Sequence, residues 1–342
     1  MNSNDSRNSN IELYRIIVMI LIVAHHYVVH SGIVTYIGNE FGSAKSIILL
    51  IFGCWGKTGI NCFVLISGYY LCNKGITLRK WLKLYLEVFF YYIVIYFSFI
   101  ISGYEVFSWK ECINTIFPIW DLSTGFISCY LVFFFFIPFI NMLINNMVEK
   151  QHIILIAICL GMYSIWGSIP YVNVSINYVS WFAVVYIIGA YIRLYPKNLY
   201  RNHSLWCLLT IGTIILSSVV IVVLGKLGFD GTIFLADSNK AFAVIVAVCS
   251  FVWVVNLPVR HNKLINIIGG STFGVLIIHT SCDAMLKWLW IDVLKTPLMY
   301  ESPYIFVHMT LSVIGVFTIC CVIDIIRKQI ISLLCKYSNS DE

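Results

Sequence analysis

One apolar segment, residues 11–30, carries the ionisable side chains best suited to chemistry. It reads IELYRIIVMILIVAHHYVVH, with Glu12 and Arg15 near one end and His26 near the other. A neutral imidazole in a low-dielectric pocket is a competent general base for a hydroxyl, and a guanidinium binds phosphate or carboxylate. Such groups are costly inside a membrane, so a membrane span that keeps them indicates a functional site.

Helical geometry relates these side chains. At about 100° per residue, Arg15 and His26 lie roughly 20° apart around a helix and about 16 Å apart along it. His25 and His30 fall about 80° and 60° from Arg15. The spacing selects His26 as the histidine that shares a face with Arg15, and it predicts that His25 contacts a neighbouring helix. An arginine that snorkels to the inner interface beside Glu12 is the structural alternative for Arg15.

The composition indicates an all-α, polytopic integral membrane protein. Of the 342 residues, 60% are hydrophobic and only 11% are charged, with a mean hydropathy of +0.88. A soluble domain is typically about 25% charged. The net charge of +6 does not indicate nucleic-acid binding, because membrane topology accounts for where the cations lie. Most of the 12 cysteines fall in apolar runs without metal-ligand spacing, so we interpret them as small buried hydrophobes and expect no metal.

Hydropathy predicts about ten membrane spans between residues 11 and 326, flanked by cytoplasmic tails at residues 1–10 and 327–342. The second span is overlong, and we expect it to break before a true span that begins near Gly59. The predicted spans are approximately 11–30, 47–72, 83–102, 125–145, 152–168, 178–195, 205–225, 240–256, 264–282 and 304–326.

The distribution of cations predicts that both termini are cytoplasmic. With the amino terminus inside, the inner segments hold fifteen of the 22 Lys and Arg residues, and the outer segments hold seven. The predicted outer loops also hold most of the acidic residues. This asymmetry follows the positive-inside rule.

Three further stretches are candidates for a site. The basic segment 73–83, NKGITLRKWLK, offers Arg79, Lys80 and Lys83 as a rim for a phosphorylated cofactor, although positive-inside anchoring explains the same cations equally well. Ser67 lies in a small-residue stretch at 58–71, and His279 lies in another at 268–283. Small residues also permit close helix packing, and a structural role for His279 stays open.

The order and spacing of these stretches resemble those of the acyltransferase-3 family, bacterial membrane enzymes that O-acylate cell-surface glycans. Arg15 and His26 match its R-X10-H signature, and GINCFVLISGYYL (59–71), followed by the basic segment, is similar to its next span. STFGVLIIH (271–279) is similar to its late histidine motif, and FISCYLVFFFFIPFIN (126–141) resembles a span of glycan O-acetyltransferases. The resemblance covers residues 10 to about 283, and the ten-span count agrees with it.

The resemblance implies acetyl-CoA as a cytoplasmic acyl donor, without a metal. It makes His26 the catalytic histidine, with Arg15 and Glu12 beside it, and it assigns the donor to Arg15 and the basic segment. It leaves Ser67 and His279 for substrate. The family's RxxR is not matched, because Leu82 stands three residues after Arg79, and the nearest equivalent pairs Lys80 with Lys83. Some members carry a fused esterase-like domain; without one, we expect direct transfer or transfer through a separate partner.

The sequence therefore predicts a membrane O-acetyltransferase of the bacterial inner (cytoplasmic) membrane. The expected acceptor is a hydroxyl of a capsule, exopolysaccharide or other envelope glycan, or of a lipid-linked oligosaccharide, and glycan-assembly proteins are the expected partners. His26 would deprotonate the hydroxyl or accept the acetyl group itself. One alternative is a transporter of envelope sugars, although no internal repeat is visible. Another is the same scaffold with a different acyl group, such as succinyl.

Overall fold

All the regular secondary structure of the described residues is helical. A computed structural model describes residues 7–120, 122, 125–170, 172 and 174–338, and no strand occurs among them. The ends of both predicted tails, residues 1–6 and 339–342, lie outside the described residues. The helices are α1 (Ser9–Val29), α2 (Ile33–Asn39), α3 (Ala44–Gly53), α4 (Gly56–Leu71), α5 (Leu78–Ile101), α6 (Trp109–Ile116), α7 (Phe126–Asn145), α8 (Glu149–Cys159), η1 (Leu160–Ile165), η2 (Trp166–Ser168), α9 (Tyr178–Leu194), η3 (Asn198–Arg201), α10 (His203–Lys226), α11 (Ala241–Val255), α12 (Lys263–Gly269), α13 (Thr272–Thr280), α14 (Asp283–Lys287), η4 (Trp288–Val293), α15 (Thr296–Met299) and α16 (Ile305–Ser338).

The helices confirm a polytopic membrane protein. Among the described residues, eight helical segments are long and apolar enough to cross a bilayer, and α9 and α11 are shorter apolar helices. All ten coincide with predicted spans, but whether ten segments cross the membrane stays a prediction, as does the side on which the termini lie. The eight longer segments are Ser9–Val29, Ala44–Leu71, Leu78–Ile101, Phe126–Asn145, Glu149–Ser168, His203–Lys226, Lys263–Thr280 and Ile305–Leu334.

Two of these segments are broken helices. The overlong second span divides into α3 and α4 at Cys54–Trp55, as expected, and α4 begins at Gly56, slightly earlier than the start expected near Gly59. The ninth divides into α12 and α13 at Gly270–Ser271. Non-helical backbone inside a membrane needs partners within the protein. Here Lys328 of α16 donates to the Gly270 carbonyl at 2.6 Å, so the second break is satisfied by a neighbouring helix.

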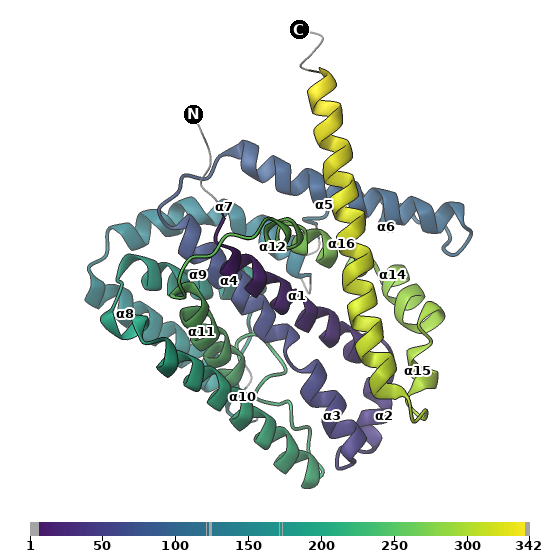
Figure 1. Ribbon diagram of the computed structural model, residues 1–342, viewed down its shortest axis with the longest axis horizontal. Helices are drawn as coiled ribbons and strands as arrows, with labels where there is room; N and C mark the ends of the chain where they lie inside the picture. The colour runs from purple at the N-terminus through teal and green to yellow at the C-terminus, as the bar shows by residue number, and fades with distance from the viewer. Residues whose placement is uncertain (1–6, 121, 123–124, 171, 173, 339–342) are drawn as a thin grey trace.

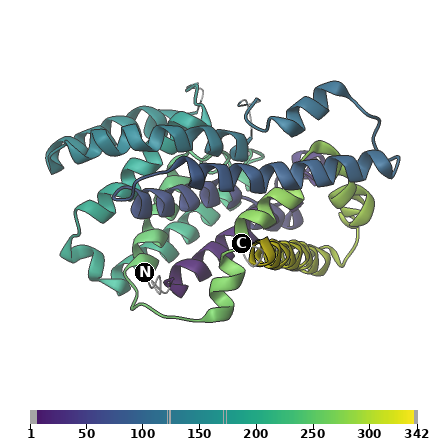
Figure 2. The same ribbon diagram turned by 90° about the horizontal axis from the view of Figure 1, so that it is seen from above.

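α5 begins earlier than predicted, and α16 ends later. Thr77 caps α5, its hydroxyl accepting from the Lys80 amide, so most of the basic segment is the first turns of a helix rather than a loop. α16 continues past residue 326 to Ser338, runs opposite to α1 (Figure 1), and lies at the edge of the bundle, where Figure 2 views it nearly along its axis. The hydroxyl of Tyr27 and the imidazole of His308 join the two helices at 2.9 Å.

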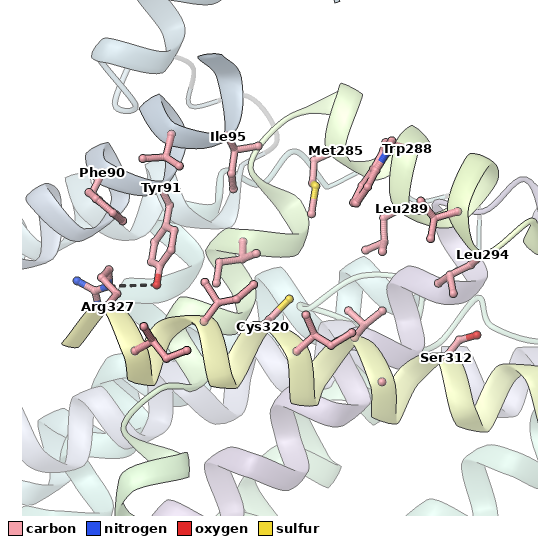
Figure 3. Close-up of a pocket in the computed structure, with 18 of the residues that line it drawn as sticks. Phe90, Tyr91, Ile95, Met285, Trp288, Leu289, Leu294, Ser312, Cys320 and Arg327 are labelled. Carbon is pink, nitrogen blue, oxygen red and sulfur yellow. Dashed lines mark hydrogen bonds between the residues drawn. The ribbon is translucent and has the colours of Figure 1, made fainter. Parts of the chain in front are cut away.

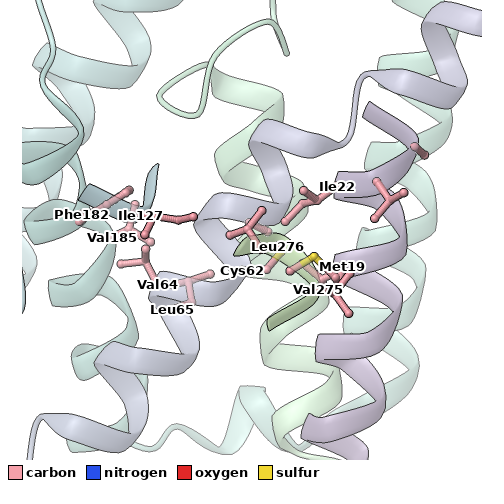
Figure 4. Packing of buried hydrophobic residues seen from close by; sticks show 14 of the residues in the cluster. Met19, Ile22, Cys62, Val64, Leu65, Ile127, Phe182, Val185, Val275 and Leu276 are labelled. Atoms are coloured by element: carbon pink, nitrogen blue, oxygen red, sulfur yellow. The ribbon is translucent and has the colours of Figure 1, made fainter. Parts of the chain in front are cut away.

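The core forms around α1, α4 and α9. In Figure 4, Met19 and Ile22 of α1 meet Cys62 of α4 and Val275 and Leu276 of α13, and all five are buried. Helix α1 also contacts α3, α11, α12 and α16, so its side chains lie within the protein rather than against lipid over much of its length. This burial lets a membrane helix keep an arginine, a glutamate and histidines.

Helices α4 and α9 pack backbone to backbone. A Cβ atom on Gly68 would lie 2.2 Å from the Tyr186 carbonyl oxygen, and one on Gly189 would lie 2.4 Å from that of Leu65. Glycine at both positions is therefore required for this approach, as small residues commonly are between membrane helices.

Candidate functional site

The inner end of the candidate site is the first half of α1, where Glu12 and Arg15 lie one turn apart. Glu12 is buried against α12, because a Cβ on Gly269 would lie 2.5 Å from its Oε2. Arg15 Nη1 reaches that oxygen at 3.4 Å, a long contact, while its buried Nε has no hydrogen-bond partner. The guanidinium also lies over Phe63 of α4, 5.9 Å from the ring centroid. A half-buried arginine with unused donors is suited to an anionic ligand.

Arg15 lines a cavity of about 830 Å³. Four cationic side chains, Arg7, Arg15, Lys74 and Arg193, face two carboxylates, Glu12 and Glu87, so the wall has an excess of positive charge. The remaining wall is mostly aromatic and aliphatic. It comprises Asn8, Ile11, Met19, Phe63, Ile66, Ser67, Tyr69, Tyr70, Leu71, Leu84, Phe126, Tyr130, Val255, Val259, Gly270, Phe273 and Leu276.

Arg193, at the end of α9, is a cavity residue that the sequence analysis did not select. Its guanidinium donates to the Tyr69 hydroxyl at 3.2 Å and lies 5.0 Å from the centroid of that ring. It remains exposed, and so do Lys74 and Arg7. The exposed cations place the solvent-facing end of the cavity beside the start of α1, which is the predicted cytoplasmic end. Arg193 reaches the cavity because α9 packs against α4, and nothing in the local sequence around Arg193 predicts this contact.

The cations of the predicted rim lie elsewhere. Arg79, Lys80 and Lys83 are exposed on the first turns of α5 and do not line the cavity, and the Lys80 ammonium donates to the Gly75 carbonyl at 3.0 Å. Of the basic segment, Lys74 alone reaches the wall.

Ser67 lines the cavity together with Tyr130 of α7. Ser67 Oγ donates to the Phe63 carbonyl at 3.0 Å and lies 2.9 Å from the Tyr130 hydroxyl. Because the serine proton is engaged, the tyrosine hydroxyl donates to Ser67. The structure therefore places Ser67 beside Arg15 and Arg193, rather than beside the histidines.

The histidines form the other end of the site. His26 Nδ1 lies 2.8 Å from His279 Nε2, which joins α1 to α13, and His279 is wholly buried. His25 Nδ1 bonds the Gly53 carbonyl at 2.6 Å, and Gly56 packs against its ring, so His25 contacts a neighbouring helix as expected. The ring of His30 lies 5.1 Å from that of His26 and is exposed. His25 and His26 therefore have different partners, on α3 and α13, and the catalytic role of His26 stays a prediction.

The cavity stops short of the histidine pair. Its deepest residue on α1 is Met19, seven positions before His26, and on α13 it is Leu276, three positions before His279. At 1.5 Å per residue, about 10 Å of α1 lies between the cavity and His26. Buried side chains such as Ile22 fill that interval.

A second hollow, of about 930 Å³, runs along α16 and has a different chemistry (Figure 3). α5, α13, α14, η4 and α16 line it, with aliphatic and aromatic side chains such as Ile95, Met285 and Leu289. Its one arginine, Arg327, is held by Glu87 at 2.6 Å, and Figure 3 shows its bond to Tyr91. This apolar groove offers nothing to neutralise an anion.

The fold and the site define a multi-pass membrane protein with a cation-lined cavity and a histidine pair in which a half-buried His26 is bonded to a wholly buried His279. The family model described as an acyltransferase domain, that of the acyltransferase-3 family, matches residues 8–326 of the 342-residue chain. The chain therefore belongs to the acyltransferase-3 family and is a membrane acyltransferase. No curated protein and no solved structure gave a significant match. Family membership favours the enzyme over the transporter alternative.

Proposed function

We propose that this acyltransferase is an O-acetyltransferase of the bacterial inner membrane. It would move acetyl from cytoplasmic acetyl-CoA to a hydroxyl of an envelope glycan or lipid-linked oligosaccharide, within the machinery that assembles that glycan. The observation that carries the proposal is the arrangement of α1: a cationic cavity surrounds Arg15, and a histidine pair lies about three turns further along the same helix.

The cavity supplies the donor site. CoA is polyanionic, and the excess of cations in the wall favours it over neutral ligands. The exposed Arg193 and Lys74 meet the phosphates first, and Arg15 uses its unpartnered Nε deeper in. Ser67 and Tyr130 line the path of the acyl arm, so we assign Ser67 to the donor rather than to the acceptor.

His26 supplies the chemistry. Its imidazole takes the proton of the acceptor hydroxyl as the oxygen attacks the thioester carbonyl. The new C–O bond forms, the C–S bond breaks, and the imidazolium returns its proton to the departing thiolate. The cavity ends before the histidine pair, so the side chains between Met19 and His26 must move aside for the thioester to reach His26.

The proposal is tested with purified protein in lipid nanodiscs, acetyl-CoA and an oligosaccharide acceptor. Free CoA is quantified by chromatography, because the protein's own thiols would react with a thiol dye, and product mass distinguishes acetyl from succinyl. We expect His26→Ala to lower CoA release at least about 10²-fold, the lower range for loss of a general base. The matched control His203→Ala, at the start of α10, is expected to retain wild-type turnover.

Two outcomes would contradict the proposed function. Full turnover in a folded His26→Ala protein would contradict the assignment of His26 as the catalytic base. Absence of acetyl transfer by the wild type to any envelope glycan offered would remove the donor and acceptor assignment. A radiolabelled acetyl group that stays on the wild type but not on His26→Ala would instead indicate an acyl-histidine intermediate.

A further inference from the structure

His279 is bonded in a way that fixes where its proton lies. Its Nδ1 lies 2.6 Å from the carbonyl oxygen of Val275, one turn earlier on α13. A carbonyl oxygen only accepts hydrogen bonds, so the hydrogen of this contact is on Nδ1 of the imidazole. The side chain is wholly buried, and none of the described carboxylates contacts it. A buried cation without a partner is costly, so the ring is neutral and its Nε2 carries a lone pair.

The lone pair on His279 in turn fixes the proton of His26. His26 Nδ1 lies 2.8 Å from His279 Nε2, and a nitrogen without hydrogen accepts. The hydrogen between the two rings therefore belongs to His26 Nδ1. Neutral His26 then has its one in-plane lone pair on Nε2, which is the nitrogen free to take a proton. In unconstrained histidine the hydrogen prefers Nε2, so the bond to His279 reverses the ordinary preference.

We propose that His279 is a positioning residue that holds His26 in the Nδ1–H tautomer and thereby makes Nε2 the base. The relay runs from the Val275 carbonyl through His279 to His26, and it joins the outer part of α13 to the outer part of α1. His279 needs no contact with donor or acceptor for this role. The proposal rests on the proposed function only for its kinetic consequence, because the tautomer is a property of the resting protein.

The tautomer is measured directly by two-dimensional NMR of protein labelled with 15N in its histidine rings, in nanodiscs. His26→Gln identifies the signals of His26 by their loss. We expect Nδ1–H in the wild type and a shift toward Nε2–H in His279→Leu, which removes the acceptor. His279→Gln places an amide oxygen near the lost Nε2, so it restores Nδ1–H. His25, bonded to Gly53, keeps its signals in every variant and serves as the internal control.

Kinetics provide the second measurement. His279→Leu is expected to lower kcat about 10²-fold, a typical loss when a general base is impaired, and to leave the KM for acetyl-CoA unchanged. His279→Gln is expected to recover most of kcat, which a purely structural role would not predict. An Nε2–H tautomer in the wild type, or a His26 tautomer unmoved in folded His279→Leu, would overturn the proposal. A correct tautomer in a protein without acetyl transfer would instead overturn the proposed function.

Discussion

The cavity beside Arg15 and the groove along α16 are similar in volume, about 830 and 930 Å³, yet only one is equipped for a charged substrate. Arg327 is the arginine of the groove and Arg15 is the half-buried arginine of the cavity, and the two differ in how many of their N–H donors are already bonded. Arg327 in the groove is bonded to Glu87, Asp324 and Tyr91 at 2.6 to 3.0 Å. Arg15 in the cavity has one long contact, at 3.4 Å, and a buried donor without a partner.

This difference shows that the number of unbonded N–H donors on an arginine, rather than the volume of the hollow beside it, indicates a ligand site. A saturated guanidinium holds helices together, because its charge is already neutralised. A guanidinium with unused donors holds an anion. The following substitutions separate the two roles.

The largest effect is expected for Arg327→Gln, and it should fall on stability. Asp324 is wholly buried, and loss of Arg327 leaves its carboxylate with the Tyr91 hydroxyl and with one cation, Lys328, instead of two. Breaking a buried ion pair costs about 3–5 kcal/mol. We expect a clear fall in the temperature at which the protein aggregates in detergent, with unchanged CoA affinity of the fraction that remains folded. A lowered CoA affinity at unchanged stability would contradict this prediction and would indicate that Arg327 takes part in donor binding.

Arg15→Gln should have the opposite effect: it should weaken binding of the acyl donor and leave the stability of the fold unchanged. One or two charge-assisted hydrogen bonds are worth about 1.5–3 kcal/mol each, so kcat/KM for acetyl-CoA should fall about 10²-fold. Arg15→Lys keeps the charge but loses the planar pair of N–H donors, so its kcat/KM for acetyl-CoA should lie between those of the wild type and Arg15→Gln. Steady-state kinetics with CoA detection measure both variants. An Arg15→Gln protein with normal kinetics would leave Arg15 as an interface anchor.

The smallest effect separates two exposed arginines near the same end of the bundle. Arg193→Leu removes a cavity cation and should weaken CoA binding about tenfold, as expected for one partly exposed charged hydrogen bond. Arg79→Leu is the matched control and should change the dissociation constant by less than about twofold, because Arg79 lies off the cavity. Calorimetry with CoA measures both. An equal loss of CoA affinity in the two variants would instead support a donor-binding role for the cations predicted on α5.

Sequence alone predicted the helical class and the ten apolar segments; that Arg15 and His26 serve one site stays a prediction, because the cavity beside Arg15 ends before His26. The class and the segments depend on hydropathy and helical period, which are local properties of the chain. It did not predict which helix ends converge. Arg193 and Tyr130 reach the cavity through packing of α9 on α4 and of α7 on α9, and that packing depends on contacts distant in sequence. The basic segment illustrates the same limit, since one cation of four reaches the wall.

The backbone contact between α4 and α9 has a mechanical consequence. Because Gly68 and Gly189 each leave no room for even one added carbon, neither helix can slide or rotate against the other without a collision. We therefore expect Ser67 and Tyr69 on α4 to move together with Arg193 on α9. With that side of the cavity fixed, we expect any clearance for a thioester to advance past Met19 to arise on the facing side, where α1 packs against the break between α12 and α13.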